Sequence, residues 1–505
     1  MKSSSSKALL YIFILLGTLA QAQTPLSHHY RQWVFGYDYF PDLRWGQNVL
    51  DFNDGTVTIA HYDKGVDYEV GGSGSLLCDA EGQLALITNG CHVSDADFNI
   101  IAQGDTLNGY DWAYQNYCEL GFPLPSIQST MLYPRANGAV LIHKDIANDN
   151  GAISYRIRVK GITESGGHYR VTSDRTIIDS VLMFGKLKTT YHANGEDIWV
   201  IATPHNSNEF ISYLVREDTI IRSVPQVLGP VLEPFTYGRI RQVTFSSHND
   251  MMAFNSIEGL LVYDYDDSTG LISNYRCYKY PTLVSDSINR IARGVCFSPS
   301  DEFVYVNNGE RIFQIKVDSD PDKPEFHDYD FQRIAGSNGT PIGIGNMLVG
   351  PDCKIYVSCA TTTFYMHVIH RPDRQGAAAE LQKHIPVPMR IYHNFPFIPN
   401  LASSCDSSIE WDIHTSVLEP LGSEADKQPL ILYPNPAITQ STLVMAPESE
   451  GTVQVRDLYG RLFCKRWKYK GDRELTMDVS DWDKGSYIIT FGSRDGEYVG
   501  KLVKL

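Results

Sequence analysis

The sequence predicts an all-β protein, and two observations carry this prediction. Aromatic and β-branched residues are abundant and are interrupted throughout by 40 glycines and 25 prolines, a composition typical of short strands joined by turns. No segment carries a long apolar stripe at helical spacing. A chain of 505 residues also exceeds the usual size of one hydrophobic core, so at least two domains or a closed repeat are expected.

The first 22 residues have the three parts of a secretory signal. Lys2 and Lys7 give a basic start, Ala8 to Ala20 form an apolar run, and Ala20-Gln21-Ala22 supplies small residues for cleavage. The apolar run is shorter than the roughly 20 residues that cross a bilayer as a helix. We therefore predict that residues 1–22 are removed on export, and that the mature chain from Gln23 has no transmembrane segment.

Charge and cysteine content exclude some classes of protein. The formal net charge of −16 makes nucleic acid an unfavourable partner. The nine cysteines include no CxxC pair, so we predict no zinc cluster and no other cofactor. Export permits disulfides, and Cys78 and Cys91 form a candidate pair across a predicted hairpin. The alternative is that most cysteines are small buried apolar residues.

An internal repeat narrows the fold. The segment Arg241–Ser247 matches Arg293–Pro299 at an offset of 52 residues, and Met347–Asp352 follows at the same interval. Each copy has a strand, a Ser-Pro-Asp-like turn and a strand ending in a Tyr-Val pair, as in Phe303–Val306. Such units are similar to WD40 or YVTN repeats, and their period predicts a β-propeller of four-stranded blades.

Looser copies precede these three, at spacings in the fifties. They begin near Leu76, Met131 and Tyr191, which brings the visible copies to six. Residues Trp33–His61 and Pro386–Leu401 each look like part of a further unit, and joining them would close the ring. We predict seven blades within residues 23–402, with six or eight as alternatives.

These motifs also resemble those of secreted propeller proteins of gliding, Gram-negative bacteria. The resemblance covers roughly Ser27 to Ala402 and specifies fold far better than activity. The segments that carry it are Trp33–Gly36, Leu50–Asn53, Thr88–Gly90, His192–Val200 and Phe297–Pro299.

The repeat ends at residue 402 and a second domain is predicted to follow. Residues 403–428 have the Ser, Asp and Glu content of a tether. Beyond them, residues 429–505 contain six or seven short strand-like segments, which favours a small immunoglobulin-like β-sandwich.

This tail resembles the type A C-terminal sorting domain of the type IX secretion system. The resemblance implies export across the outer membrane, to the cell surface or the medium, through contact with that secretion machinery. It also implies cleavage near the 403–428 tether. The residues that carry the sorting signal are Pro434, Asn435, Pro436, Asp457, Gly460, Gly485, Tyr487, Gly500, Lys501 and Leu502.

The last strand of the tail has a pattern suited to docking. Lys501 and Lys504 flank the apolar pair Leu502 and Val503, and we expect an alternating edge strand with which a receptor could pair. Deleting residues 500–505 is therefore expected to trap the protein in the periplasm.

No motif in the chain identifies a catalytic site. The sequence has no nucleophile elbow, phosphate-binding loop, zinc-protease helix or dinucleotide fingerprint. Asp95, Asp97 and Asn99 begin like a calcium loop, but Ile100 replaces the required glycine, so a solvated turn is predicted there.

Several polar residues are candidate ligand contacts in the propeller, foremost His192, Asp197, Arg241 and Arg293. His192 and Asp197, together with His205 and His248, would need to converge near the axis to hold a ligand or act as a base. The repeat places Arg241 and Arg293 at equivalent points of neighbouring blades, where two guanidiniums would bind an anion. The competing interpretation gives each of these side chains a structural partner.

Two functions remain after the sequence is read. The first is an exported module that binds a glycan, a peptide or a surface protein through its loop faces. The second is a hydrolase or lyase that acts on extracellular polymers in the central pocket of the propeller. The absence of a catalytic motif favours the binding module, and a plugged central channel would favour it further.

Overall fold

A computed structural model of the chain has two compact units, of which the first ends at Ile413 and the second runs from His414 to Leu505. The predicted signal peptide lies outside the described residues. The structure describes residues 25–37, 46–62, 70, 73–105, 107–108, 114–115, 117–120, 128–149, 152–180, 187–204, 207–232, 242–255, 259–279, 294–307, 311–330, 344–359, 363–391, 395–411, 413, 428–429, 431–444, 450–457, 462–470, 474–482, 484–493 and 496–504.

The first unit consists of seven antiparallel sheets. The first sheet has β1 (Gln32–Tyr37), β2 (Gly46–Asp51) and β3 (Thr56–Tyr62), with β27 (Glu410–Trp411) added in parallel. The other six sheets follow in chain order, and the seven sheets are numbered as blades 1 to 7. Blade 2 has β4 (Ser75–Cys78), β5 (Leu84–Thr88) and β6 (Val93–Asp95); blade 3 has β7 (Thr130–Arg135), β8 (Gly138–Asp149), β9 (Ala152–Ser165) and β10 (His168–Ser180); and blade 4 has β11 (Lys188–Tyr191), β12 (Ile198–Ala202), β13 (Ser207–Arg216) and β14 (Thr219–Leu232). Blade 5 has β15 (Val243–Phe245), β16 (Met251–Asn255), β17 (Gly259–Asp266) and β18 (Leu271–Lys279); blade 6 has β19 (Val295–Phe297), β20 (Phe303–Asn307), β21 (Arg311–Lys316) and β22 (Phe326–Asp330); and blade 7 has β23 (Ile344–Val349), β24 (Ile355–Cys359), β25 (Thr363–Ile369) and β26 (Leu381–Ile391).

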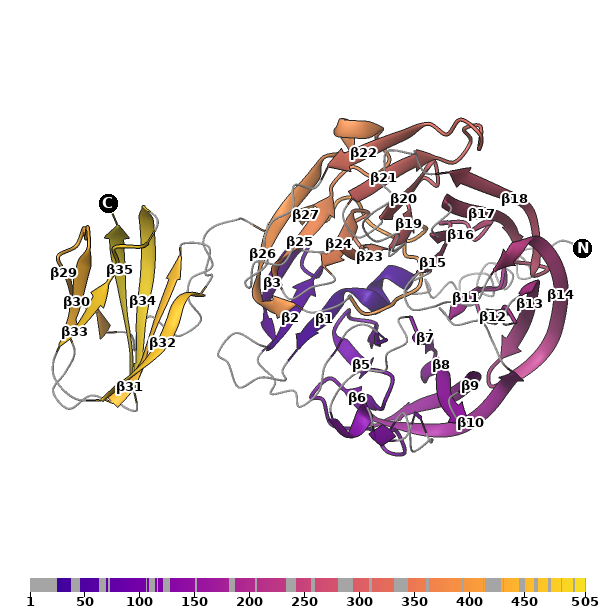
Figure 1. Ribbon diagram of the computed structural model, residues 1–505. Helices are drawn as coiled ribbons and strands as arrows, with labels where there is room; N and C mark the ends of the chain where they lie inside the picture. The colour runs from indigo at the N-terminus through magenta and orange to yellow at the C-terminus, as the bar shows by residue number, and fades with distance from the viewer. Residues whose placement is uncertain are drawn as a thin grey trace, which may run out of the picture. The chain divides into compact units, whose positions relative to one another are not determined.

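These sheets surround a common centre as the blades of a propeller (Figure 1). The predicted all-β class and the seven blades are thus confirmed. The three well-matched repeat copies form the innermost strands β15, β19 and β23 of blades 5, 6 and 7. Helical structure in the described part of the chain is limited to short pieces, including the 3₁₀ turns η1 (Leu26–Tyr30), η2 (Cys118–Leu120) and η3 (Gly376–Ala379). No helix among the described residues is long and apolar enough to cross a membrane.

The ring closes differently from the sequence prediction. Both ends of the propeller chain do contribute to blade 1, but the added strand is β27 and not the segment Pro386–Leu401. Pro386 lies in β26, the outermost strand of blade 7, where it pairs with Tyr365. The strand pattern around Pro386 was therefore correct, although it completes blade 7 instead of blade 1.

Residues 403–411, which the sequence assigned to a tether, pack on the propeller. We name residues 395–411 the strap. Its Cys405 forms a disulfide with Cys353 of blade 7, and its Glu410 pairs with Thr56 of blade 1. Trp411 lies against the ring of Tyr356, with centroids 6.1 Å apart. The compact unit accordingly extends to Ile413.

The proposed pairing of Cys78 with Cys91 is wrong. Cys91 is bonded to Cys118, with Cα atoms 5.4 Å apart, whereas Cys78 is a free thiol buried in β4. Cys78 Sγ accepts a hydrogen bond from the backbone N–H of Gln32 at 3.4 Å. It therefore faces the first blade and not the hairpin partner that the sequence suggested.

The core lies between neighbouring blades, because strand residues alternate between the two faces of each sheet. Trp199 of blade 4 is fully buried against blade 5, where its indole N–H donates to Asp267 O at 2.6 Å. Gly270, at φ +76°, leaves room for this ring, since a Cβ there would approach it to 2.6 Å. Trp199 therefore fills a gap between blades 4 and 5.

The second unit has two sheets. The larger has the order β28-β35-β34-β31-β32 and the smaller the order β29-β30-β33. The immunoglobulin-like character of this sandwich stays a prediction. Its strands are β28 (Gln428–Pro429), β29 (Ile431–Tyr433), β30 (Gln440–Val444), β31 (Glu450–Asp457), β32 (Leu462–Lys470), β33 (Glu474–Asp478), β34 (Gly485–Ser493) and β35 (Gly496–Lys504).

Candidate functional site

Two glutamines join innermost strands of the propeller through their side-chain amides. Gln128, just before β7, donates to Val243 O and accepts from Val243 N, both at 3.0 Å. Gln242 donates to Met347 O at 2.7 Å, and its Oε1 accepts from Met347 N and Val295 N at 3.1 and 3.2 Å. Both amides are buried and have partners on both polar ends, so they fix blades 3, 5, 6 and 7 around the axis.

The strap also runs along the innermost strands. Phe397 N–H donates to Gly74 O at 2.7 Å, beside β4 of blade 2. Asn400 Nδ2 donates to Phe245 O at 2.6 Å, in blade 5. Earlier in the strap, Phe395 N donates to the Asn346 Oδ1 of blade 7 at 3.1 Å. One short segment therefore contacts innermost strands of three blades.

Little space remains where these groups meet. The cavity there has a volume of about 30 Å³. Its lining residues come from innermost strands and from the strap, among them Gln128, Gln242, Phe245, Phe397 and Asn400. A cavity of this size holds a water molecule or two, whereas pockets for small-molecule ligands measure roughly 300 Å³ or more. In the described part of the propeller, residues 397–400 plug this part of the channel.

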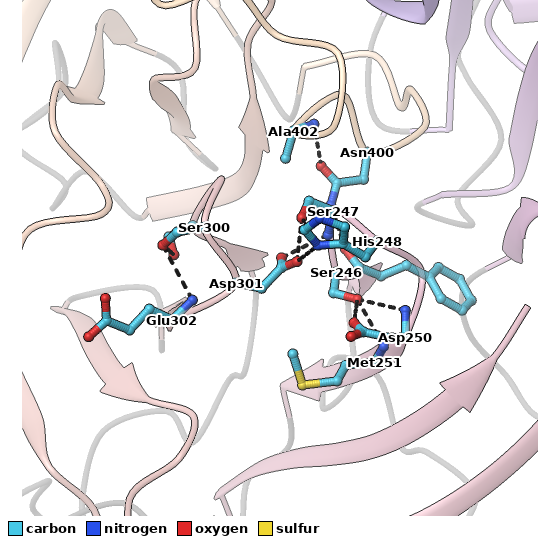
Figure 2. A network of polar contacts seen from close by, with 12 residues as sticks. Ser246, Ser247, His248, Asp250, Met251, Ser300, Asp301, Glu302, Asn400 and Ala402 are labelled. Atoms are coloured by element: carbon cyan, nitrogen blue, oxygen red, sulfur yellow. Dashed lines mark hydrogen bonds and ion pairs between the residues drawn. The ribbon is translucent and has the colours of Figure 1, made fainter.

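A Ser-His-Asp cluster lies in the turns beside the plug (Figure 2). Asp301 accepts hydrogen bonds from the Ser247 hydroxyl and from the Ser247 N–H, the latter at 2.7 Å. His248 Nδ1 lies 2.9 Å from the same hydroxyl and 3.0 Å from the same carboxylate. In a hydrolytic triad the imidazole bridges serine and aspartate through two different nitrogens. Here one nitrogen meets both groups and the imidazole is 74% exposed, so the cluster lacks the two-nitrogen bridge of a hydrolytic triad.

The cluster is instead part of a repeated connection between blades. Asn249, Asp301 and Cys353 occupy equivalent places in the first turns of blades 5, 6 and 7, at φ 56°, 61° and 61°. Asn249 Oδ1 accepts from Thr190 of blade 4 at 2.5 Å, as Asp301 accepts from Ser247 of blade 5. In blade 7, Cys353 makes the disulfide to the strap. The same strained position thus joins each blade to a different neighbour.

His192 and Asp197, two of the predicted site residues, lie in the first turn of blade 4. Asp197 accepts from Arg216 Nε and Nη2 at 3.0 and 2.8 Å and from Asn194 Nδ2 at 2.9 Å. The bond to Arg216 lowers the pKa of Asp197 below its usual value. His192 Nδ1 accepts the Asn194 N–H at 3.0 Å. These contacts organise the turn, and a ligand contact at either residue stays a prediction.

The remaining candidates are placed less completely. His248 belongs to the first turn of blade 5 and to the cluster with Asp301. Arg241, Arg293 and His205 lie outside the described residues, so their predicted roles stay predictions.

Asp95 Oδ1 accepts the N–H groups of Asp97 and Asn99 at 2.9 and 3.0 Å, which is the solvated turn expected from the sequence. Among the described residues, no three His, Cys, Asp or Glu side chains are placed to hold a metal ion.

A buried charged cluster in blade 3 was missed by the sequence reasoning. Lys160 Nζ and Arg158 Nη2 donate to Asp174 Oδ2 at 2.5 and 2.8 Å, and Arg158 Nη1 lies 3.6 Å from Asp145. The side chain of Asp145 is 1% exposed, and among the described residues no donor lies within 3.5 Å of its oxygens in hydrogen-bond geometry. In the same part of the chain, the ring nitrogens of the fully buried His143 have no partner within that limit. The signal was visible as His143-Lys144-Asp145 within an apolar strand.

Burial sets the protonation of this cluster. It raises the pKa of Asp145 to about 6 and lowers the pKa of His143 to about 3, where Lys160 and Arg158 add to the effect. Burial alone would also raise the pKa of Asp174, but the bonds from Lys160 and Arg158 bring it below its usual value. The His143 ring is therefore neutral at pH 7, and Asp145 carries a costly buried charge.

Lys188 is a second buried charge, between blades 4 and 5. Its ammonium donates to Thr203 Oγ1 at 2.6 Å and lies 5.5 and 4.9 Å from the ring centroids of Phe210 and Phe254. Burial lowers its pKa to about 7. The aromatic faces stabilise the cation, and the ordered contacts account for its position as a structural side chain.

The predicted sorting residues gather around β34 and β35 of the second unit. Tyr487 pairs with Leu502 and Ile489 with Gly500, while Asn435 Oδ1 accepts the Val503 N–H at 2.9 Å. Leu502 is fully buried and Tyr487 is 4% exposed. Asp457 is at the end of β31 opposite Tyr487. Gly460 lies outside the described residues.

The prediction that the last strand is an edge strand is wrong. β34 pairs with one edge of β35, and Gln428 and Pro429 pair with the other at Tyr498 and Val499. Ala437 N–H donates to Val503 O on that same edge at 2.8 Å. Lys501–Lys504 therefore belong to a strand inside the sheet, and the apolar side chain that this strand places in the core is Leu502.

Fold and sites together define the class of protein: a seven-bladed β-propeller followed by a separate two-sheet module. Residues 431–505 match the family described as the secretion system C-terminal sorting domain. The chain therefore carries a type IX sorting domain at its C-terminus. This domain indicates secretion across the outer membrane, to the cell surface or the extracellular space.

Comparisons of the whole chain are less specific. A provisionally assigned 6-phosphogluconolactonase from Bacteroides fragilis is 13% identical, with a TM-score of 0.41, and the match covers 73% of this chain and 96% of that one. The periplasmic gluconolactonase of Pseudomonas aeruginosa is 10% identical, with a TM-score of 0.38 and coverage of 89% and 99%. No curated protein matches this chain. Likeness at this level carries no argument about activity.

Proposed function

We propose that the propeller is a binding module that acts after export and holds a glycan, a peptide or a surface protein on its loop faces. The observation that supports this best is the plug at the axis. Phe397 and Asn400 bond to innermost strands of blades 2 and 5 and leave a cavity of about 30 Å³. A substrate in the central channel would have to displace hydrogen-bonded, buried residues of the strap.

The outer surfaces suit a binding role for a general physical reason. A propeller holds its loops on a rigid ring of sheets, so the loops can vary and still present fixed contacts. We retain Arg241 and Arg293 as the proposed anion contacts, because the repeat places them at equivalent points of blades 5 and 6. An anionic glycan would be the matching ligand.

The other candidate, an enzyme with its site in the central pocket, has less support. Ser247, His248 and Asp301 lack the geometry of a triad. Asp145 has a pKa suited to a general base, but its side chain is 1% exposed.

A screen of the mature full-length chain separates the two functions. We expect saturable binding to members of a panel of anionic and neutral glycans, with no release of shorter products. Arg241→Gln/Arg293→Gln is expected to lose binding to the anionic members, and the exposed Arg371→Gln/Arg374→Gln serves as a matched control. Depolymerisation by the wild-type chain would contradict the binding module and favour the enzyme.

A further inference from the structure

The larger sheet of the sorting domain has one long open edge. β31 pairs with β32 from Glu450 opposite Lys470 to Arg456 opposite Leu462. Among the described residues, no strand pairs with the other edge of β32. An open edge presents a row of unpaired N–H and C=O groups to any strand that approaches it.

The other edges in the described part of this domain are covered or short. β35 has partners on both sides, as shown by its pairing with β34 and with Gln428 and Pro429. The edges of the smaller sheet are β29 and β33, with three and five residues, whereas β32 has nine. β32 is thus the longest edge available to a partner.

The sequence of this edge is basic. Its nine residues, LFCKRWKYK, include Lys465, Arg466, Lys468 and Lys470 and no acid, although the chain as a whole has a formal charge of −16. A run of four cations on an acidic protein selects for a partner of opposite charge.

We propose that β32 is a docking strand, and that its occupant is an acidic β-strand of a protein in the secretion machinery. Strand addition supplies main-chain hydrogen bonds, and the basic residues select the acidic partner. A protein strand fits better than an anionic lipid, because a lipid offers no peptide groups to pair with an open edge. This proposal concerns export and is independent of the function of the propeller.

Export of the full-length chain tests the proposal. In a host with type IX secretion, Lys465→Glu/Lys468→Glu/Lys470→Glu is expected to lower the exported fraction by about tenfold, since like charges would meet across the interface. The protein should accumulate in the periplasm. The control Lys279→Glu/Lys323→Glu/Lys484→Glu makes the same change of charge at exposed positions elsewhere and should be exported as the wild type is.

Folding must be checked alongside export. The purified variants are compared by thermal melting, and the single change Lys468→Glu replaces the triple variant if the latter unfolds. A folded variant with normal export overturns the proposal. A neutral variant, Lys465→Ser/Lys468→Ser/Lys470→Ser, gives a second test. If this variant aggregates while the Glu variant is exported, the proposal is also overturned, because the charges of β32 would then serve only to prevent edge-to-edge aggregation.

Direct binding distinguishes the partner classes. A labelled peptide of alternating Glu and Val is expected to bind the wild-type chain and the control, and to lose that binding in the Glu variant. Vesicles with anionic lipid should give equal, weak binding to all three chains. Binding to vesicles but not to the peptide, lost in the Glu variant, would replace the protein strand by a lipid and overturn the proposal.

Discussion

At the scale of single residues, blade 3 carries charged side chains at buried positions of its strands. His143 and Asp145 point to the same face of β8, because residues two apart in a strand share a face. Arg158 lies opposite His143 in the register, and Lys160 pairs with Asp174. Asp174 accepts hydrogen bonds from both Lys160 and Arg158, whereas among the described residues Asp145 has only the more distant Arg158 guanidinium, at 3.6 Å. The cluster therefore stores an unfavourable free energy at neutral pH.

Replacing Asp145 by Asn should make this cost visible. Burial raises the pKa of Asp145 to about 6, so between about pH 4 and 6 the folded chain holds a proton that the unfolded chain has released. Stability contributed by this proton is present below pH 4 and is lost as the pH rises through 6. We compare the free energy of unfolding of Asp145→Asn with that of the wild type by chemical denaturation. The difference, variant minus wild type, should be about 3 kcal/mol larger at pH 7 than at pH 4.

Asp174→Asn is the matched control and should show the opposite sign. The pKa of Asp174 lies below its usual value, so its contribution is present at neutral pH and is lost on acidification. Equal responses of the two variants to pH would mean that Asp145 is not the buried acid described here.

At the scale of elements, the strap makes contacts with residues that are far from it along the chain. Its disulfide closes a loop of 52 residues, whereas Cys91–Cys118 closes one of 27. In the chain-entropy description, a longer loop gives a larger loss of disorder in the unfolded chain. The two bonds are therefore expected to stabilise the fold unequally.

Paired Cys→Ser variants measure this difference. Cys353→Ser/Cys405→Ser should lower the free energy of unfolding by about 4 kcal/mol, and Cys91→Ser/Cys118→Ser by slightly less. Denaturant titrations without reductant provide the values. If the strap bond contributed less than about 1 kcal/mol, the strap would be held by its other contacts alone.

The final strand of the sorting domain supports a prediction about export. Residues 500–504 pair with Gly485–Ile489, and Leu502 is buried in the core of the sandwich. A chain without Gly500–Leu505 should accumulate in the periplasm, because both the ladder and the core are lost. Fractionation of cells measures this, and delivery of the truncated chain to the surface would refute it.

At the scale of the whole molecule, the propeller needs the strap to close its ring. A chain of residues 23–402 lacks β27 and Cys405, whereas one of residues 23–413 contains both. We expect the longer chain to melt in one cooperative transition, at a higher temperature than the shorter chain. Calorimetry of the two decides this, and identical melting curves would show that the ring is stable without residues 403–413.

Much of the fold could be predicted from the sequence, because the information was local or periodic. The interval that relates Val295 to Val243 and to Met347 repeats a strand and its turn, and from it the number of blades followed. The closing strand β27 has two residues and no periodic partner, so nothing in Glu410–Trp411 indicated its pairing with β3. Disulfide partners were missed for the same reason, since they depend on distance in space.

The candidate site was harder to predict than the fold. His192 and Asp197 were predicted as ligand contacts near the axis, which stays a prediction, and their contacts with Asn194 and Arg216 depend on turn geometry. The axial glutamines Gln128 and Gln242 stand immediately before strands and have no motif. Their role follows from the meeting of blades that are more than a hundred residues apart in the chain.

The place of the strap in the chain also bears on the order of folding. Contacts within a blade join neighbours in sequence, so they can form while later blades are still being made. The pairing of Glu410 with Thr56 joins opposite ends of the domain and has no such early route. Until residue 411 is present, the propeller is an open arc, because β27 cannot yet pair with β3. Because the sorting domain comes after the strap in the chain, synthesis of the export signal begins only after every residue needed to close the ring is present.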